Sequence, residues 1–196
     1  MRLIITRHGE TEENKAGIIQ GHLPGKLSEE GFAQAKKVAL RLKDEKIDYI
    51  YSSDLARTSD TTREIMKFHP HVPVEFVRDL REKYLGDWQG RKKSDVGFSK
   101  VTSVLALDAK DAETSGELFD RAKKFLHTIL TKHPKHTVLL AGHNAINKAL
   151  VAVITNKTPE DIRTMPNFHN TSITIFEVGE HKKHRIIVYN CKKHLD

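Results

Sequence analysis

A chain of 196 residues with 38% hydrophobic and 30% charged residues can bury one sizeable core, and no stretch of it is polar enough to stay unfolded. We therefore expect one domain over residues 1–196. The longest apolar runs are strand-sized, far below the ~20 residues that a membrane-spanning helix needs, so we expect no membrane insertion. The single cysteine, Cys191, excludes an intramolecular disulfide and a thiolate zinc cluster.

The formal net charge of +7 at pH 7 and the isoelectric point near 9.4 favour anionic partners. Nucleic acid, acidic membrane surfaces and phosphorylated metabolites all meet this condition, and the charge alone does not distinguish them. The first residues, Met1 to His8, lack the apolar segment and small-residue cleavage site of a secretory signal. We therefore expect a cytoplasmic location.

The beginning of the chain predicts a strand, a loop and a helix. Residues 3–5 form a short apolar run that ends in the more polar residues 6–9, as a buried strand does where it emerges at the edge of a sheet. A polar, glycine-bearing loop continues to Lys26. Ser28 then caps a helix whose apolar face is marked, at helical spacing, by Phe32, Ala35, Ala39 and Leu42.

The following segments continue the alternation of strands and helices. Residues 47–51 predict a second strand, and a helix follows with Ser53 or Asp54 as its cap. Residues 74–78 predict a third strand. The stretch 79–110 has little periodicity, so we expect it to pass as an excursion over the functional face of the protein.

The second half of the chain adds two helices and three strands. Apolar residues at helical spacing predict helices over 119–129 and 145–153, and apolar runs predict strands over 137–141, 173–176 and 185–189. Strands and helices that alternate in this way predict an α/β fold. We expect a three-layer α/β/α sandwich around a mostly parallel sheet.

Two histidines, His8 and His143, each follow directly after a predicted strand. Ligands bind at the carboxyl ends of the strands in open α/β sheets, so we expect both imidazoles in one crevice. Arg7 and Arg57 should reach the same edge of the sheet. Guanidinium groups bind phosphate oxygens with paired donors, and imidazole can serve as nucleophile or acid. This combination favours phosphoryl-transfer chemistry.

A metal site is the main alternative use of these histidines, since histidine is the commonest metal ligand. No second histidine stands at His-x-His or His-x-x-x-His spacing from His8 or His143. His69 and His71 do have His-x-His spacing, but they flank Pro70 in a predicted surface loop. We therefore predict no metal site.

Other phosphate-binding motifs are incomplete. Residues 21–27 resemble a Walker A loop but have one residue too few between the glycines, and Leu27 stands where Ser or Thr must reach magnesium. No Gly-x-Gly-x-x-Gly occurs, so the dinucleotide fingerprint is missing. No arginine follows Cys191, as a cysteine-phosphatase loop requires, so its thiol is predicted to be idle.

The residues around His8 belong to a longer motif. Residues 3–11, which read Leu-Ile-Ile-Thr-Arg-His-Gly-Glu-Thr, resemble the Arg-His-Gly-Glu-Thr signature of the histidine phosphatase superfamily, the phosphoglycerate mutase-like proteins. The similarity spans nearly the whole chain, through Asn14, Gln20-Gly21, residues 27–31, 52–58, 80–82 and 86–90, Gly142-His143 and residues 170–172.

The resemblance implies a phosphoglycerate mutase-like fold and assigns roles to individual residues. It makes His8 the nucleophile, Glu82 the proton donor to the leaving group, and Arg7, Arg57 and His143 the phosphate pocket. It further implies no metal or other cofactor. His8 must be neutral to attack, and its cationic neighbours disfavour its protonation. The predicted substrate-binding residues at the mouth are Asn14, Gln20, Gly21 and Asn144.

Three positions depart from the pattern of the family. Asn144 follows His143 where glycine is frequent, Gly25-Lys26 replaces an Asp-x-Pro-like stretch, and residues 115–118 only partly resemble Gly-Gly-Glu-Ser. These departures concern contacts with the substrate rather than catalysis.

The resemblance leaves a phosphatase and a phosphoglycerate mutase as alternatives. The cofactor-dependent mutases are longer and carry an adjacent arginine pair in the middle excursion, which residues 91–116 lack. We therefore expect a metal-independent phosphomonoesterase that acts on a small phosphorylated metabolite through a phosphohistidine intermediate.

A non-catalytic basic module that binds phosphate or nucleic acid is the non-enzymatic alternative. The chain contains His8, Glu82 and His143 and has no aromatic-interleaved basic stretch of the kind that stacks bases. We therefore expect no nucleic-acid partner. An isologous interface leaves no signature in one chain, so a homodimer is compatible with the sequence but not implied by it.

Overall fold

The computed structural model describes residues 1–97, 109–179 and 184–196. The part of the predicted excursion at residues 98–108 lies outside this description. The described chain folds around a six-stranded sheet in the order β3-β2-β4-β1-β5-β6. These strands are β1 (Arg2–Arg7), β2 (Tyr49–Ser53), β3 (Val74–Val77), β4 (Thr137–Gly142), β5 (Ile173–Val178) and β6 (His184–Cys191).

Four strands form the parallel part of this sheet. β1 pairs in parallel with β4, and β2 pairs in parallel with both β4 and β3. β5 and β6 complete the other edge in antiparallel pairing. The expected mostly parallel sheet is thus confirmed, and β1 and β4 lie side by side at its centre.

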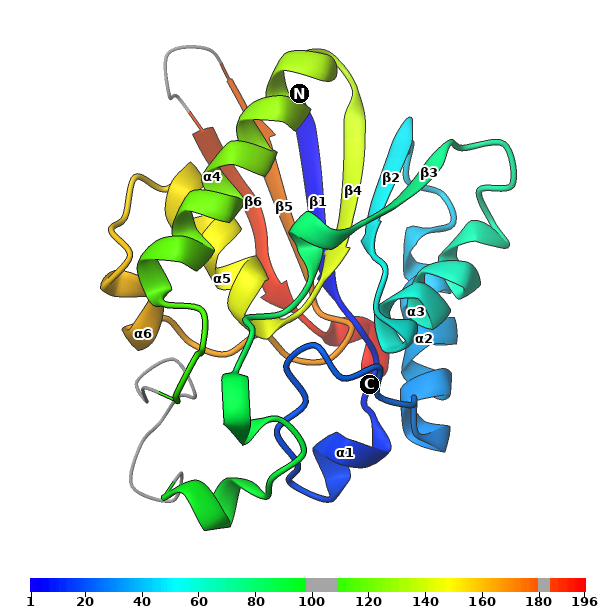
Figure 1. Ribbon diagram of the computed structural model, residues 1–196. Coiled ribbons are helices and arrows are strands. Elements are labelled where there is room, and N and C mark those ends of the chain that lie inside the picture. The colour runs from blue at the N-terminus through cyan, green and yellow to red at the C-terminus, as the bar shows by residue number, and fades with distance from the viewer. Residues whose placement is uncertain (98–108, 180–183) are drawn as a thin grey trace.

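Helices cover both faces of the sheet, as Figure 1 shows. α2 (Glu29–Leu42) and α3 (Ala56–Met66) pack on one face, and α4 (Ser115–Lys132) and α5 (Asn144–Ile154) pack on the other. Side chains alternate along each strand, so Ile4 contributes to the core on the first face while Leu3 and Ile5 contribute to the second. The three-layer α/β/α sandwich is therefore confirmed.

Two short helices were not predicted, and the first of them lies in a segment that was expected to be a loop. α1 (Glu12–Lys15) interrupts the loop after β1, because Thr11 and Asn14 form a capping box. α6 (Asp161–Thr164) lies between α5 and β5. The remaining short elements are 3-10 turns: η1 (Arg78–Leu80), η2 (Gly86–Trp88), η3 (Lys93–Val96) and η7 (Lys193–Leu195).

The predicted cap of α3 was wrong. Leu55 takes the N-cap position, and no side chain caps the helix. The two polar residues before it have other partners, because Ser53 bonds the ring of His143 and Asp54 accepts two bonds from Arg81, at 2.6 and 2.7 Å. Both side chains thus form hydrogen bonds with residues at the carboxyl end of the sheet instead of capping α3.

The predicted surface position of His69 was also wrong. Its side chain lies at the end of α3 and is only 9% exposed, and its Nε2 lies 3.0 Å from the carbonyl oxygen of Leu42. No helix among the described residues is long and apolar enough to cross a bilayer.

Candidate active site

The carboxyl ends of β1, β2 and β4 bring the predicted catalytic residues together. Arg7 at the end of β1 pairs with Gly142 at the end of β4, and the amide of His8 continues this ladder by donating to the Gly142 carbonyl at 3.1 Å. The rings of His8 and His143 consequently lie with their centroids 5.0 Å apart. The parallel pairing of β1 with β4 thus brings the two imidazoles together, although only His8 lines the cavity described next.

A cavity of about 200 Å³ opens at this edge. Of the nine residues predicted for the site, every one except His143 contributes to its wall. His143 is completely buried and lies behind the lining. The lining residues are Arg7, His8, Asn14, Ile18, Ile19, Gln20, Gly21, Arg57, Glu82, Leu85, Lys93, Asn144 and Asn167.

The ring of His8 has a defined tautomer. Its Nδ1 lies 2.7 Å from the carbonyl oxygen of Gly9, and a carbonyl can only accept, so Nδ1 carries the hydrogen. The basic lone pair is therefore on Nε2. Burial, followed by the charges of Arg57 and Arg7, holds the pKa of His8 well below its usual range. The ring is thus neutral and able to act as a nucleophile.

Close packing against α2 fixes the loop that carries His8. A side-chain carbon on Gly9 would lie 2.4 Å from the carbonyl oxygen of Gly31, and one on Gly31 would lie 1.9 Å from that of Glu10. Only glycine at these two positions allows the loop and the first turn of α2 to approach so closely. The amide of Gly9 is also held by the hydroxyl of Thr61, at 3.0 Å.

His143 is held from both sides of its ring. Nδ1 accepts from Nε of Arg57 at 3.2 Å, so Nε2 carries the hydrogen. Nε2 lies 2.9 Å from the hydroxyl oxygen of Ser53 and 3.1 Å from that of Thr58. Burial lowers the pKa of His143 well below its usual range, with a further contribution from Arg57. In this arrangement a neutral His143 orients Arg57.

The side chain of Arg57 is only 1% exposed and is fixed by backbone carbonyls. Nη1 donates to Leu23 at 2.6 Å and to Pro24 at 3.2 Å, and Nη2 donates to Gly21 at 2.8 Å. Burial, which outweighs the opposing charge of Glu82, lowers the pKa of Arg57 to about 10. Arg57 therefore remains cationic at neutral pH and lies at the wall of the cavity.

Arg7 keeps donors available for a ligand. Its Nη1 donates to the carbonyl of Phe168 at 2.6 Å, while its buried Nε has no hydrogen-bond partner among the described residues. Burial lowers the pKa of Arg7, although the charge of Glu82 opposes this effect. Two arginines with fixed directions thus line one small cavity, which is the arrangement that binds phosphate oxygens well.

Glu82 presents one carboxyl oxygen to the backbone. Its Oε1 accepts from the amide of Lys83 at 3.0 Å and from that of Ala145, in the first turn of α5, at 2.9 Å. Both of these donors lie on Oε1, which leaves Oε2 available to a ligand in the cavity that Glu82 lines. Asp79 and Asp87, the two other acids of this region, are exposed and do not line the cavity.

Four of the cavity residues form its predicted mouth. Gln20 donates to Thr11 at 2.9 Å, while its buried Oε1 has no partner among the described residues. Asn14 is tied to the backbone of Thr11 by the capping box. Asn144 donates to Asn167 at 3.1 Å. The carbonyl of Gly21 accepts a hydrogen bond from Nη2 of Arg57.

Sequence reasoning missed several residues of the site. Asn167 and Lys93 line the cavity, and Ser53 and Thr58 hold His143. For Ser53 a signal existed, since it lies two residues after the predicted strand 47–51, which ends at the same edge as His8. Asn167 and Lys93 lie in irregular segments without periodicity, and no pattern in the sequence identifies them.

The largest omission is Lys148 of α5, one turn after Asn144. Its side chain is completely buried, and its Nζ has no hydrogen-bond partner in the described structure. Burial lowers the pKa of Lys148 to about 8, with opposing contributions from Glu82 and Arg7. A signal did exist, because Lys148 is the one charged residue in the otherwise uncharged helix 144–154.

Within the described ranges, no group of three or more His, Cys, Asp or Glu side chains could hold a metal ion. His69, half of the His-x-His pair, bonds to a backbone carbonyl in the interior. Cys191 is half-buried and lies at the end of β6.

A family model of the histidine phosphatase superfamily (branch 1) matches residues 3–192 of the chain. The chain is 30% identical to phosphoglycerate mutase-like protein 4 of Arabidopsis thaliana, over 99% of this chain and 86% of that protein. It is 36% identical to a metal-independent phosphoserine phosphatase of the same plant, over 78% of this chain and 68% of that protein. Among solved structures, a mycobacterial glucosyl-3-phosphoglycerate phosphatase in complex with VO3 superposes with a TM-score of 0.86 at 27% identity, covering 97% and 99% of the two chains.

Proposed function

The chain belongs to the histidine phosphatase superfamily, and we propose that it hydrolyses small phosphomonoesters through a phosphohistidine on His8, without a metal ion. One observation carries this proposal. The unprotonated Nε2 of a neutral His8, the half-buried Arg7, the buried Arg57 and the carboxyl of Glu82 belong to the same cavity of about 200 Å³. That volume suits a small phosphorylated metabolite.

The first step is transfer of the phosphoryl group to His8. Arg7 and Arg57 hold the phosphoryl oxygens and offset their charge. Nε2 of His8 forms a bond to phosphorus while the bond from phosphorus to the leaving oxygen breaks. Glu82 gives its proton to that oxygen, so the product leaves as an alcohol. His143 orients Arg57 rather than touching the substrate in this geometry.

The second step returns the enzyme to its starting state. The ionised Glu82 takes a proton from a water molecule, whose oxygen attacks the phosphorus of the phosphohistidine. The bond from phosphorus to Nε2 breaks, and inorganic phosphate leaves. The atoms balance with water as the co-substrate, and no oxidant, metal or organic cofactor enters either step.

Phosphatase relatives favour hydrolysis over the mutase alternative. The relatives include a metal-independent phosphoserine phosphatase and a glucosyl-3-phosphoglycerate phosphatase. Residues 91–116 lack the adjacent arginine pair that the mutases carry. We therefore propose that the anionic partner favoured by the positive net charge is a phosphorylated metabolite rather than a nucleic acid.

A single quenched turnover tests the phosphohistidine. Labelled phosphomonoester mixed with enzyme in excess chelator should leave acid-labile, base-stable label on His8. His8→Ala should carry none, whereas His71→Ala, which removes an exposed histidine far along the chain, should carry the normal amount. Label on a serine or an aspartate would reject the nucleophile. Activity that disappears with chelator and returns with a divalent cation would reject the metal-free mechanism.

A further inference from the structure

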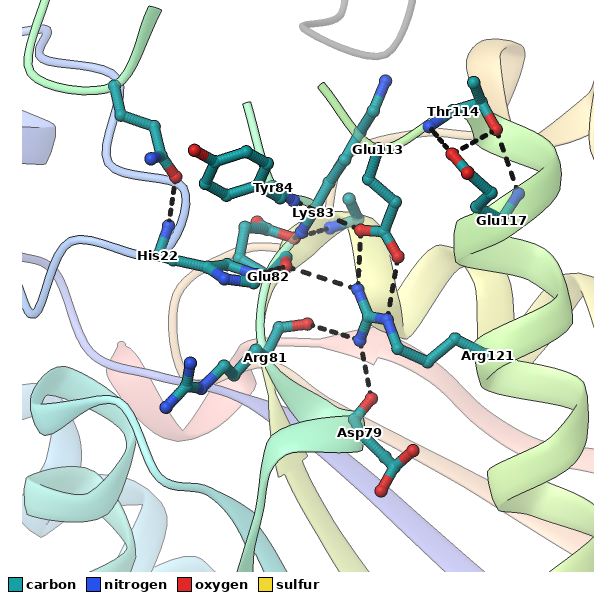
Figure 2. Close-up of polar contacts among 12 residues, drawn as sticks. His22, Asp79, Arg81, Glu82, Lys83, Tyr84, Glu113, Thr114, Glu117 and Arg121 are labelled. Atoms are coloured by element: carbon teal, nitrogen blue, oxygen red, sulfur yellow. Dashed lines mark hydrogen bonds and ion pairs between the residues drawn. The ribbon is translucent and has the colours of Figure 1, made fainter. Parts of the chain in front are cut away.

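Arg121 of α4 does not line the cavity. All five of its N–H groups donate hydrogen bonds to Glu113 or to the backbone around Glu82 (Figure 2). Nε and Nη2 form a two-point ion pair with the carboxylate of Glu113, with both contacts at 2.8 Å. Nη1 donates to the carbonyls of Asp79 at 2.7 Å and Arg81 at 3.0 Å, and Nη2 also donates to the carbonyl of Glu82 at 3.3 Å.

These carbonyls all belong to one short segment, residues 79–84, which we call the acid loop. Glu113 holds the far end of this loop, because its carboxylate accepts from the amide of Tyr84 at 3.2 Å and its own amide donates to the Tyr84 carbonyl at 3.0 Å. Arg121 and Glu113 together therefore contact the acid loop along its whole length. Figure 2 shows the guanidinium between the Glu113 carboxylate and the backbone of the loop.

Two other contacts hold the acid loop: Leu80 is buried in the core, and Arg81 forms a two-point ion pair with Asp54, at 2.6 and 2.7 Å. The loop lies after β3 and includes the last two residues of the single turn η1, so no sheet ladder or long helix fixes its backbone. His22 provides a second contact to the Glu82 carbonyl, from the opposite direction, with Nε2 at 2.8 Å. The Glu82 carboxyl itself is held by the amide of Ala145. The position of the catalytic acid thus depends on a small number of side chains.

The pair formed by Arg121 and Glu113, which we call the clamp, is largely buried, and its hydrogen bonds are charge-assisted. The side chains of Arg121 and Glu113 are only 20% and 14% exposed. Bonds from a guanidinium to carbonyl and carboxylate oxygens are stronger than neutral ones, and the planar fork loses little freedom when it forms several of them. A displacement of about 1 Å at a catalytic group can cost about 10²-fold in rate, so a clamp of this kind matters to the chemistry.

We propose that Arg121, supported by Glu113, is a positioning residue that holds the acid loop so that Glu82 can protonate the leaving group. This inference rests on the function proposed above. Arg121 touches no substrate and acts through Glu82. It should therefore matter for poor leaving groups, which need a proton, and little for good ones.

The test compares glycerol phosphate with p-nitrophenyl phosphate in the first turnover, before hydrolysis of the phosphoenzyme can limit the rate. Arg121→Met should slow phosphoryl transfer from glycerol phosphate by about 10²-fold and from p-nitrophenyl phosphate by about threefold or less. Arg121→Lys, which keeps the charge but loses the planar fork, should fall between Arg121→Met and the wild type. Arg185→Met, which breaks the exposed Arg185–Glu177 pair instead, should leave both rates unchanged.

A second background separates positioning from general stability. In Glu82→Gln, which has no proton to give, adding Arg121→Met should cause almost no further loss with glycerol phosphate. Glu113→Gln should show a weaker form of the Arg121→Met pattern if Arg121→Met folds poorly. Equal losses with the two substrates, or a full Arg121 effect that persists beside Glu82→Gln, would overturn the positioning role while leaving the phosphatase intact. A Glu82→Gln variant that shows no preference for the better leaving group would overturn the acid assignment and the clamp together.

Discussion

The floor of the site, which we define as Arg7, His8 and Arg57 in the cavity wall with His143 behind them, differs from the acid loop in what holds it. The floor rests on the central strands, since His8 continues the β1–β4 ladder and His143 directly follows β4. The acid loop is attached by side chains from other elements. Backbone ladders tolerate changes of side chain, whereas a side-chain clamp fails when one residue is replaced. The nucleophile and the acid should therefore respond differently to mutation.

Removing the carboxylic acid of Glu82 should have the largest effect on the rate of phosphoryl transfer, and it tests the role of the acid loop directly. Glu82→Gln should lower the rate of phosphoryl transfer from an alkyl phosphate on the order of 10²–10⁴-fold, the usual range for general acid catalysis, and that from p-nitrophenyl phosphate clearly less. An alkoxide is a much stronger base than p-nitrophenolate and needs the proton more.

Rapid-quench measurement of the first turnover checks this prediction. Asp79→Asn, whose exposed side chain points away from Glu82 in Figure 2, is the matched control and should behave like the wild type. If Glu82→Gln slowed phosphoryl transfer from the two substrates equally, another residue would have to be the proton donor.

Changing the floor should give an effect that does not depend on the leaving group. Arg57→Lys removes the fork that bonds Gly21, Leu23 and His143, and should lower kcat/KM by about 10²–10³-fold, as expected for loss of a donor to transition-state charge. Both substrates carry the same phosphoryl group, so their losses should match. Steady-state kinetics on the two esters measures this, and a loss confined to glycerol phosphate would contradict the division between floor and loop.

Lys148 is coupled electrostatically to both regions, through Glu82 in the loop and Arg7 in the floor. Its folded pKa of about 8 lies below the ordinary 10.5, so the unfolded chain binds more protons between these values. The shift corresponds to a penalty of about 3 kcal/mol that is complete below pH 8 and disappears above pH 10.5.

Lys148→Met should therefore raise the free energy of unfolding by up to about 3 kcal/mol at pH 7, and the gain should shrink as the pH rises toward 10.5. Urea unfolding of both proteins at several pH values checks this. Lys157→Met, at an exposed position after α5, serves as the control and should show no such trend. A gain that stays constant with pH would mean that packing, not charge, is responsible.

The sequence predicted the floor better than the loop for a physical reason. His8 and His143 follow apolar runs, and the ends of parallel strands share an edge, so their meeting could be inferred from local pattern. Glu82 lies in a segment without periodicity, and only its resemblance to a family motif identified it. The contact of Arg121 with the acid loop has no local signature, because the backbone carbonyls that accept its hydrogen bonds lie about forty residues earlier in the chain.

Other errors came from tertiary contacts that compete with local preference. Ser53 and Asp54 are good capping residues, but their side chains form hydrogen bonds with His143 and Arg81 and do not cap α3. His69 looked exposed because it precedes a proline, yet the end of α2 offers its ring a carbonyl in the interior. The six strands and the four longer helices, which depend on periodic burial, were predicted correctly, while the short helices α1 and α6 and the partners of single polar side chains were not.

The central position of β1 and β4 also has a consequence for folding. These two strands are neighbours in the sheet but far apart in the sequence, since Arg2 of β1 pairs with Thr137 of β4. Pairings between distant segments form slowly, because the entropy of closing a long loop is lost before any contact compensates for it. The ability to bind phosphate or vanadate should therefore appear late in refolding, after the helical circular dichroism signal has recovered.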